Sequence, residues 1–476
     1  MRQLSAADGW QLFLETPNAP NQVAGLGIYD PSTAPTGRVT FEAVLQHVES
    51  RLPLAPPFRR SLLKVPFGLD EPYWIEDGRF DLEYHVRHTA LPRPGTWKQL
   101  ATQVARLHAQ RLDLSRPPWE IYMIEGIDGM EGVPSGSFAV LVKLHHAAID
   151  GVAGNELLTA IHDHSPKPDE TELEDPWKPE ATPSDWQLLA LAGTHNLLLP
   201  VRIGRVMARQ VPALREARLS IRRRTRPYDD VKLPGMSIPN TRFGGRVSPH
   251  RVIEYRAWPL SRVRAIKAAV EGATVNDVAL AICGGSLRRY LAEKDELPDR
   301  TLVSIVPVSI RTEEELQTGG NRIRVMRTAL YTDVADPVER LRAIRAMTAR
   351  AKAVRVGVPA QVLAGISEEM PGRIIGAAQR ATVNMTTRLG TAMGANTTVT
   401  NVPGPREPLY LCGAQEVAIV GAGPVIDGMG IIHIASSYRD DFSISVTACR
   451  EMLPDPETYG FCMQHAFEEL FERATA

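Results

Sequence analysis

Cysteine is scarce in this sequence, and the four cysteines present have no paired spacing. Cys283, Cys412, Cys449 and Cys462 lie far apart, without a CxxC motif. This pattern favours reduced, partly buried thiols in a cytosolic protein over disulfides or a metal site. Long apolar runs are missing too, because no stretch reaches the roughly 18 uncharged apolar residues of a membrane-spanning helix. We therefore expect contact with lipid, if any, only from the surface.

An excess of either charge is also missing. The chain carries 54 Lys and Arg against 55 Asp and Glu, a formal net charge of −1 at pH 7, which argues against a nucleic-acid-binding protein. Residues 1–5 lack the apolar core of a secretory signal, so we expect a cytoplasmic protein. The histidines within 85–88 and 162–164 lack the further ligands that a zinc site needs, and we expect no metal. The glycines within 421–423 lack a βαβ context and predict a loop rather than a dinucleotide site.

The length of 476 residues exceeds one ordinary core and predicts two domains, and the composition, 43% hydrophobic and 23% charged, is typical of a soluble globular protein. Residues 165–183 are rich in Pro, Asp and Glu and predict a linker. We expect an N-terminal unit at 1–165, a linker with a basic helical section at 166–249, and a C-terminal unit at 250–476.

Hydrophobic periodicity predicts alternating strands and helices in both units, hence an α/β fold. The expected strands are 23–29, 121–125, 138–144, 251–256 and 302–308, with a hairpin formed by 430–438 and 442–449. The expected helices are 40–51, 97–110, 152–161, 184–224, 260–271 and 275–293, with a last one from 456.

The most informative segment is His145-His146-Ala147-Ala148-Ile149-Asp150-Gly151, between a predicted buried strand and a predicted helix. Polar side chains at such a junction leave a rigid scaffold and can meet a ligand. Adjacent residues at a strand end point to opposite faces, so His145 and His146 cannot share one job. Asp150, just before the helix, can accept backbone N–H groups or pair with a cation. Gly151 removes a Cβ where the backbone turns sharply.

The HHxxxDG pattern resembles the signature of the CoA-dependent acyltransferase superfamily, which includes chloramphenicol acetyltransferase and peptide-synthetase condensation domains. The wider sequence resembles the bacterial wax ester synthase/diacylglycerol acyltransferase family over nearly its whole length. One departure is Pro117-Pro118-Trp119, where the family usually has Pro-Leu-Trp. The stretches that carry the likeness are 4–10, 80–86, 116–120, 145–151, 276–277, 307–311, 320–321, 401–405 and 437–438.

The resemblance implies two chloramphenicol-acetyltransferase-like subdomains, joined by a helical linker, with an active-site tunnel between them. It implies an O-acyltransferase that moves a fatty acyl group from acyl-CoA to diacylglycerol, giving triacylglycerol, or to long-chain alcohols, giving wax esters. It places the general base on His146, and we expect His145 to fix the loop. The sequence has no GxSxG elbow and no Cys beside a His, so we expect direct transfer without an acyl-enzyme. Acyl-CoA is then a substrate, and no cofactor is expected.

The same resemblance gives Asp150 a structural ion pair with an arginine, and Arg311 is the expected partner. A surface cation at a strand end is the alternative for Arg311. Asn276 and Asp277 begin a predicted helix, where Thr274 and Asp277 have the spacing of a capping box. The Asn276 amide is well placed to stabilise an oxyanion or to bind the acceptor, and the resemblance favours functional roles for both residues.

The helical section is strongly basic. Nine arginines stand against one glutamate between 201 and 226, after a mostly apolar stretch at 188–201. Such a pattern suits anionic lipid headgroups or the phosphates of CoA, and a solvated interdomain helix is the alternative. The arginines expected to contact lipid or CoA are Arg215, Arg218, Arg222, Arg223 and Arg224.

Two other functions stay open at this point. One keeps the fold and changes the acceptor, as in condensation-type amide or ester formation. The other is a non-catalytic lipid-droplet or acyl-binding relative. The expected partners are acyl-CoA, a lipid acceptor and a membrane or lipid-inclusion surface, without nucleic acid; a homodimer stays open, as does the choice between diacylglycerol and fatty alcohol.

Overall fold

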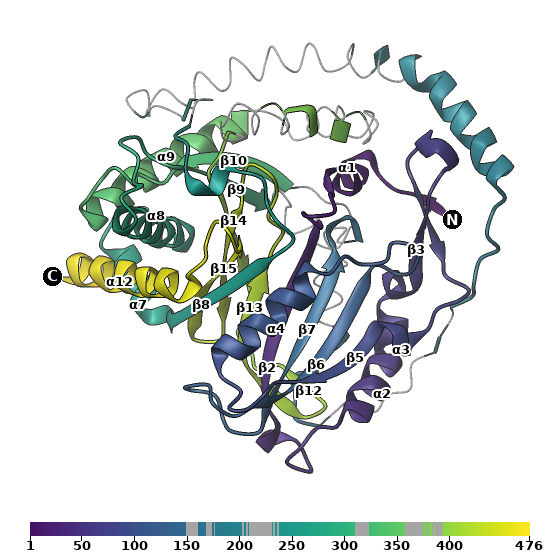
Figure 1. The fold of residues 1–476 in the computed structure, drawn as a ribbon, viewed down its shortest axis with the longest axis horizontal. Helices are drawn as coiled ribbons and strands as arrows, with labels where there is room; N and C mark the ends of the chain where they lie inside the picture. Colours follow the sequence, from purple (N-terminus) through teal and green to yellow (C-terminus); the bar gives the residue numbers. More distant parts are fainter. Residues whose placement is uncertain are drawn as a thin grey trace.

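The structure is a computed structural model of alternating strands and helices (Figure 1). The residues that it describes are 1–148, 160–167, 174–175, 177–201, 204–205, 208, 231, 234–235, 238–309, 323–357, 374, 376–377, 380–382, 385 and 394–476. Short 3₁₀ segments join the larger elements: η1 (Pro31–Thr33), η2 (Leu52–Leu54), η3 (Pro56–Arg59), η4 (Pro66–Gly68), η5 (His146–Ala148) and η7 (Arg242–Gly244). Within this part of the chain, no helix combines the length and the apolar character needed to cross a bilayer.

The N-terminal half is built on a six-stranded sheet with the order β12-β13-β2-β7-β6-β5. Its central strand β7 is buried along its whole length, because its alternate side chains enter two cores. Phe138 and Val140 pack with residues of α2, whereas Ala139 and Leu141 pack with residues of α4. The elements are β2 (Gln22–Asp30), α2 (Phe41–Arg51), α3 (Leu82–His85), β5 (Val86–Ala90), α4 (Trp97–Ala109), β6 (Trp119–Ile127), β7 (Ser137–His145), β12 (Tyr410–Leu411) and β13 (Ala414–Ala422).

The C-terminal half has a second six-stranded sheet, with the order β10-β9-β11-β14-β15-β8. Helices α7, α8, α9 and α12 pack together beside it, on the left of Figure 1. Its elements are β8 (Arg251–Pro259), α7 (Leu260–Ala268), α8 (Val275–Glu293), β9 (Val303–Ser309), β10 (Ile323–Ala329), α9 (Pro337–Gly357), β11 (Thr397–Pro403), β14 (Ile431–Tyr438), β15 (Asp441–Cys449) and α12 (Pro456–Thr475).

One segment of the C-terminal half belongs to the N-terminal sheet. Strand β13 pairs antiparallel with β2, and Gly421 lies opposite Gly25. The loop expected at Gly421 is therefore wrong. A Cβ on Gly421 would lie 2.8 Å from the side chain of Ile434 in β14, so glycine lets β13 lie close against the C-terminal sheet. Strand β13 therefore links the two halves by strand pairing, a contact that a division of the chain at residue 250 does not describe.

A third, smaller sheet lies beside α1 (Ala6–Leu14) and has the order β1-β4-β3. A helix over residues 185–201, unlabelled at the upper right of Figure 1, packs next to it. Leu188 and Ala192 of this helix are buried against Val65 and Tyr73. The helical section expected from 184 is thus confirmed up to 201, and residues 209–224 lie outside the described part. The strands are β1 (Arg2–Gln3), β3 (Arg60–Leu63) and β4 (Tyr73–Glu76).

Candidate active site

The histidine pair lies where the sequence places it, at the end of β7. His145 is the last residue of the strand and His146 the first of η5. The backbone N–H of His145 donates to the carbonyl of Pro118 at 2.9 Å, and that of His146 to the carbonyl of Asn21 at 2.9 Å. The two carbonyls belong to the residues just before β6 and β2, the strands on either side of β7. The unusual Pro118 keeps the carbonyl that this contact needs, so the extra proline is compatible with the turn.

The buried side chain of His145 stabilises the turn. Its side chain has no exposed surface, and its Nδ1 accepts the backbone N–H of Ala147 at 3.1 Å. Burial, together with nearby His146 and Arg111, lowers the pKa of His145 to about 3. The ring is therefore neutral, with its proton on Nε2. These contacts fit the expectation that His145 fixes the loop.

His146 is placed differently. Its side chain is half-buried, in contrast to the fully buried His145. Burial lowers the pKa of His146, and its own backbone carbonyl acts in the opposite direction. Its Nδ1 is buried and has no hydrogen-bond partner among the described residues. The two histidines thus have different surroundings, as their adjacent positions predict.

A buried polar cluster that the sequence reading missed supports this strand end. Lys143, two residues before His145 and on the same face of β7, has no exposed surface. Its Nζ donates to the carbonyls of Leu107 and Gln110, at 3.0 and 2.8 Å, and pairs with Glu120 at 2.9 Å. A charged residue inside an otherwise apolar predicted strand was the available signal. Lys143 thereby fastens the C-terminal end of α4 to the sheet beneath the histidines.

Two further polar side chains complete the cluster. Gln22, opposite His145 in the register of β2 and β7, donates from Nε2 to the carbonyls of His108 and of Gln110, the latter at 2.7 Å. His108 is 1% exposed, and burial, with the charges of Lys143 and Arg251, lowers its pKa to about 3. The cluster therefore carries its positive charge on Lys143 and keeps its histidine neutral.

The sequence predicts three further residues at the site. Asp150, Gly151 and Arg311 all lie outside the described residues. Their expected ion pair and turn therefore stay predictions. The same holds for the arginines expected to contact lipid or CoA, namely Arg215, Arg218, Arg222, Arg223 and Arg224.

Asn276 and Asp277 lie in the first turn of α8, where the expected capping box is confirmed. Asp277 accepts the backbone N–H of Thr274 at 2.8 Å, and Thr274 Oγ1 accepts that of Asp277 at 3.3 Å. The other carboxylate oxygen of Asp277 accepts Thr348 Oγ1–H at 2.7 Å, which ties α8 to α9. Asp277 is thus structural. Asn276 is half-buried, and α8 packs on α7, α9, α12 and β11, whereas η5 packs on α1. A catalytic role of Asn276 stays a prediction.

The other histidines of interest have protein partners. His162 Nε2 lies 2.7 Å from the Tyr29 hydroxyl, and His85 Nδ1 lies 2.8 Å from the carbonyl of Trp119. His88 pairs with Glu125 at 2.8 Å. Among the residues that the structure describes, no group of three or more His, Cys, Asp or Glu side chains is arranged to hold a metal ion.

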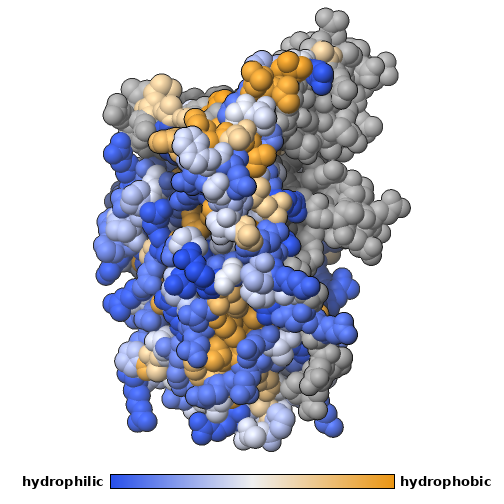
Figure 2. All heavy atoms as spheres, turned by 90° about the vertical axis from the view of Figure 1, so that its right-hand side faces the viewer, coloured by the Kyte–Doolittle hydropathy of each residue, from blue (hydrophilic) through white to orange (hydrophobic). Residues whose placement is uncertain are grey.

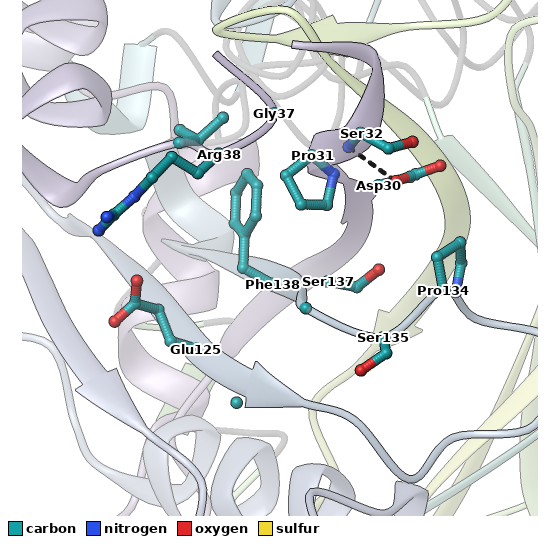
Figure 3. A pocket seen from close by; sticks show the side chains of 13 residues that line it. Asp30, Pro31, Ser32, Gly37, Arg38, Glu125, Pro134, Ser135, Ser137 and Phe138 are labelled. Atoms are coloured by element: carbon teal, nitrogen blue, oxygen red, sulfur yellow. Dashed lines mark hydrogen bonds between the residues drawn. The ribbon is translucent and has the colours of Figure 1, made fainter.

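A pocket of about 370 Å³, lined by both polar and apolar residues, lies at the opposite ends of β2 and β7 from the histidine pair (Figure 3). Asp30 and Ser137 mark those ends, and Arg38 and Glu125 lie at its side. Asp30 accepts the backbone N–H of Ser32 at 2.9 Å, which stabilises the turn at its rim. Nothing in this arrangement connects the pocket to chemistry at His146.

Comparison with known proteins extends these observations. Residues 4–279 match the wax ester synthase/diacylglycerol acyltransferase catalytic domain, and residues 319–471 match the C-terminal domain of the same family. A Mycobacterium tuberculosis protein, whose name gives it as a predicted diacylglycerol O-acyltransferase, is 33% identical over 452 residues. The alignment covers 94% of this chain and 92% of that protein.

Solved structures show the same fold. A wax ester synthase/diacylglycerol acyltransferase from Marinobacter aquaeolei is 25% identical, with a TM-score of 0.68 over the whole of both chains. The starter condensation domain of rhizomide synthetase is 13% identical, with a TM-score of 0.52 over 100% of this chain and 94% of that one. The expected α/β architecture of two related halves is confirmed by these likenesses.

Proposed function

The chain belongs to the wax ester synthase/diacylglycerol acyltransferase family, and on that premise we propose that it transfers a fatty acyl group from acyl-CoA to a lipid hydroxyl. The acceptor is diacylglycerol, giving triacylglycerol, or a long-chain alcohol, giving a wax ester. The observation that carries the proposal is His146: a half-buried, neutral imidazole at the end of a rigid, fully buried strand.

The reaction needs little from the protein on the acyl side, since a thioester is already activated. His146 Nε2 takes the proton of the acceptor hydroxyl while its oxygen attacks the thioester carbon. The resulting tetrahedral intermediate collapses, the C–S bond breaks, and the CoA thiolate takes the proton back from His146. The base is neutral again after each turnover, so no further proton donor is required.

His146 suits this task better than His145 for a geometric reason. The Nδ1 of His145 is engaged with Ala147, and its buried Nε2 carries the proton. A lowered pKa keeps His146 unprotonated, hence ready to accept a proton, at and below neutral pH.

Direct transfer, without an acyl-enzyme, is part of the proposal. The sequence contains no GxSxG elbow, and burial raises the pKa of Cys283, Cys412 and Cys462, which disfavours the thiolate that a cysteine nucleophile needs. Both substrates then bind together, and the reaction passes through a ternary complex.

Purified protein, labelled palmitoyl-CoA and a panel of acceptors test this proposal. We expect labelled ester with dioleoylglycerol, hexadecanol or both, together with stoichiometric release of CoA. An amine acceptor in the panel tests the condensation-type alternative. Label that stays on the protein after acceptor is withheld would contradict direct transfer, and the absence of ester with every acceptor would contradict the function.

The lipid acceptor and product are nearly insoluble, so we further propose that the enzyme works at a lipid surface from the cytoplasmic side. Such an enzyme requires a surface that binds lipid.

A further inference from the structure

Exposed apolar side chains gather on one part of the molecule. Among the residues that the structure describes, fourteen large apolar side chains are exposed, and seven of them lie either in the turn at η4 or on the helix at 185–201. Figure 2 shows apolar side chains at the upper end of the face that carries this helix. We call these seven residues the apolar cap: Phe67, Leu69, Trp186, Leu191, Leu197, Leu198 and Val201.

The helix at 185–201 has two apolar faces, and only one is covered. Leu188 and Ala192 are buried against the small sheet. On the opposite side, residues 186, 190, 193, 197 and 201 are Trp, Ala, Gly, Leu and Val, and all are exposed. At 100° per residue these five share a stripe about 80° wide. A helix with two apolar faces is expected to have both of them covered, so the exposed stripe is expected to contact a further surface.

The turn at η4 extends the same surface. Phe67 is 91% exposed, and its φ of 58° is a left-handed conformation that is rare for an aromatic residue. The carbonyl of Leu69 accepts Asn196 Nδ2–H at 2.8 Å, and Asp70 pairs with His195 at 2.7 Å. These contacts fix the protruding Phe67 beside the end of the helix that carries Leu197 and Val201.

The charges around the cap identify what covers it. Asp185 is exposed one residue before Trp186, but neither residues 60–69 nor residues 187–205 contain an Asp or Glu, and both contain basic residues. Lys64 and Arg205 are exposed, and the sequence continues to residue 226 with nine arginines against one glutamate, counted from 202. Protruding apolar side chains within a basic surface are the features of a protein that inserts into an anionic bilayer.

We propose that the apolar cap is the membrane-docking surface, with Phe67, Trp186, Leu197 and Val201 inserted below the headgroups of an anionic phospholipid bilayer. The inference rests on the proposed function, because an enzyme for lipid acceptors needs such a surface, but its evidence lies outside the candidate active site. It assigns docking to described residues of the turn and helix, in addition to any contribution of the arginines beyond them.

Vesicle flotation of the full chain tests the assignment, with phosphatidylcholine vesicles that contain or lack phosphatidylglycerol. We expect the wild type to float with the anionic vesicles, and Phe67→Ser/Leu197→Ser/Val201→Ser to bind them about tenfold more weakly. Phe461→Ser is the matched control, since Phe461 is 63% exposed on α12 in the other half, and its flotation should equal that of the wild type. Equal flotation of the triple variant and the wild type would overturn the proposal.

Trp186 gives a second readout. It is 81% exposed, so its fluorescence should shift to shorter wavelength on addition of anionic vesicles, and Trp186→Phe should lose most of that shift. The triple variant should keep its thermal midpoint and its transfer to a water-miscible alcohol, because the substituted residues are exposed. A wild type that floats but forms no ester would overturn the proposed function and leave the docking surface intact. Conversion of a wild-type dimer to a monomer by the triple variant, with flotation unchanged, would show that a second copy covers the cap.

Discussion

Lys143 and Glu120 form a buried ion pair between β7 and β6, with 2.9 Å between Nζ and a carboxylate oxygen. Neither residue is more than 5% exposed. Removal of Glu120 leaves the buried Lys143 ammonium without a carboxylate, which costs about 3–5 kcal/mol. Glu120 itself also accepts the Tyr122 hydroxyl at 2.9 Å and lies 3.4 Å from Arg87, so we expect Glu120→Gln to lower the free energy of unfolding by that order and Lys143→Met to lower it by less. Urea unfolding measures both, and the double variant should lose clearly less than the sum of the two single losses. Additive losses would show that the two charges are not coupled.

Buried neutral histidines predict acid sensitivity. Burial lowers the pKa of His108, His145 and His433 to about 3, whereas an unfolded histidine titrates near 6.5. As the pH falls from 6.5 towards 3, these histidines therefore bind protons in the unfolded chain but not in the folded chain. The stability that each contributes is complete above pH 6.5 and is lost below it.

For each such histidine, the loss between pH 7 and pH 5 is about 2 kcal/mol. Urea unfolding at both pH values measures the total. His433→Gln should reduce the difference between the two pH values by about the share of one histidine, even if the variant is less stable at both. An unchanged difference would mean that His433 is protonated in the folded state.

The capping box of α8 separates the roles of two neighbours. Asp277→Ala removes the acceptor of both Thr274 and Thr348, and we expect a loss of about 1–3 kcal/mol in the free energy of unfolding. Thr348→Ala, which removes only the link to α9, should cost less. A thermal midpoint of Asp277→Ala equal to that of the wild type would contradict the structural role.

For Asn276 we expect an effect on turnover rather than on stability. This expectation comes from the sequence and not from an observed contact. If its amide stabilises the transition state, Asn276→Ala should lower kcat more than it raises the KM for acyl-CoA, with little change in stability. Steady-state kinetics with varied acyl-CoA separates the two effects. A rise in KM alone would assign Asn276 to binding.

The sequence predicted what depends on local patterns. The buried run at 138–144 became β7, and the histidine pair lies at the end of that strand and the start of η5. The helix opened by Thr96 begins with a capping box that uses Gln99, and the hairpin near the end of the chain is β14 and β15. Each of these features is set by residues close together in sequence.

Long-range features were not predictable in this way. The pairing of β13 with β2 joins residues almost 400 positions apart, and nothing in the local pattern at Gly421 indicates a partner there. The contact of Lys143 with Glu120 and the end of α4 likewise needs three segments that only the fold brings together. The apolar stretch before residue 201 was visible, but the turn at Phe67 that extends its surface was not.

The proposed reaction depends on His146 as the general base, and replacement of this residue tests that role. His146→Ala should remain folded, with a thermal midpoint close to that of the wild type, and should release CoA about 10²–10⁴-fold more slowly in the presence of acceptor. His465→Ala is the matched control, since His465 is exposed on α12. In the wild type, the acid limb of kcat/KM should lie below the ordinary histidine value of about 6.5, because burial lowers the pKa of His146. Near-normal turnover by folded His146→Ala protein would contradict the mechanism.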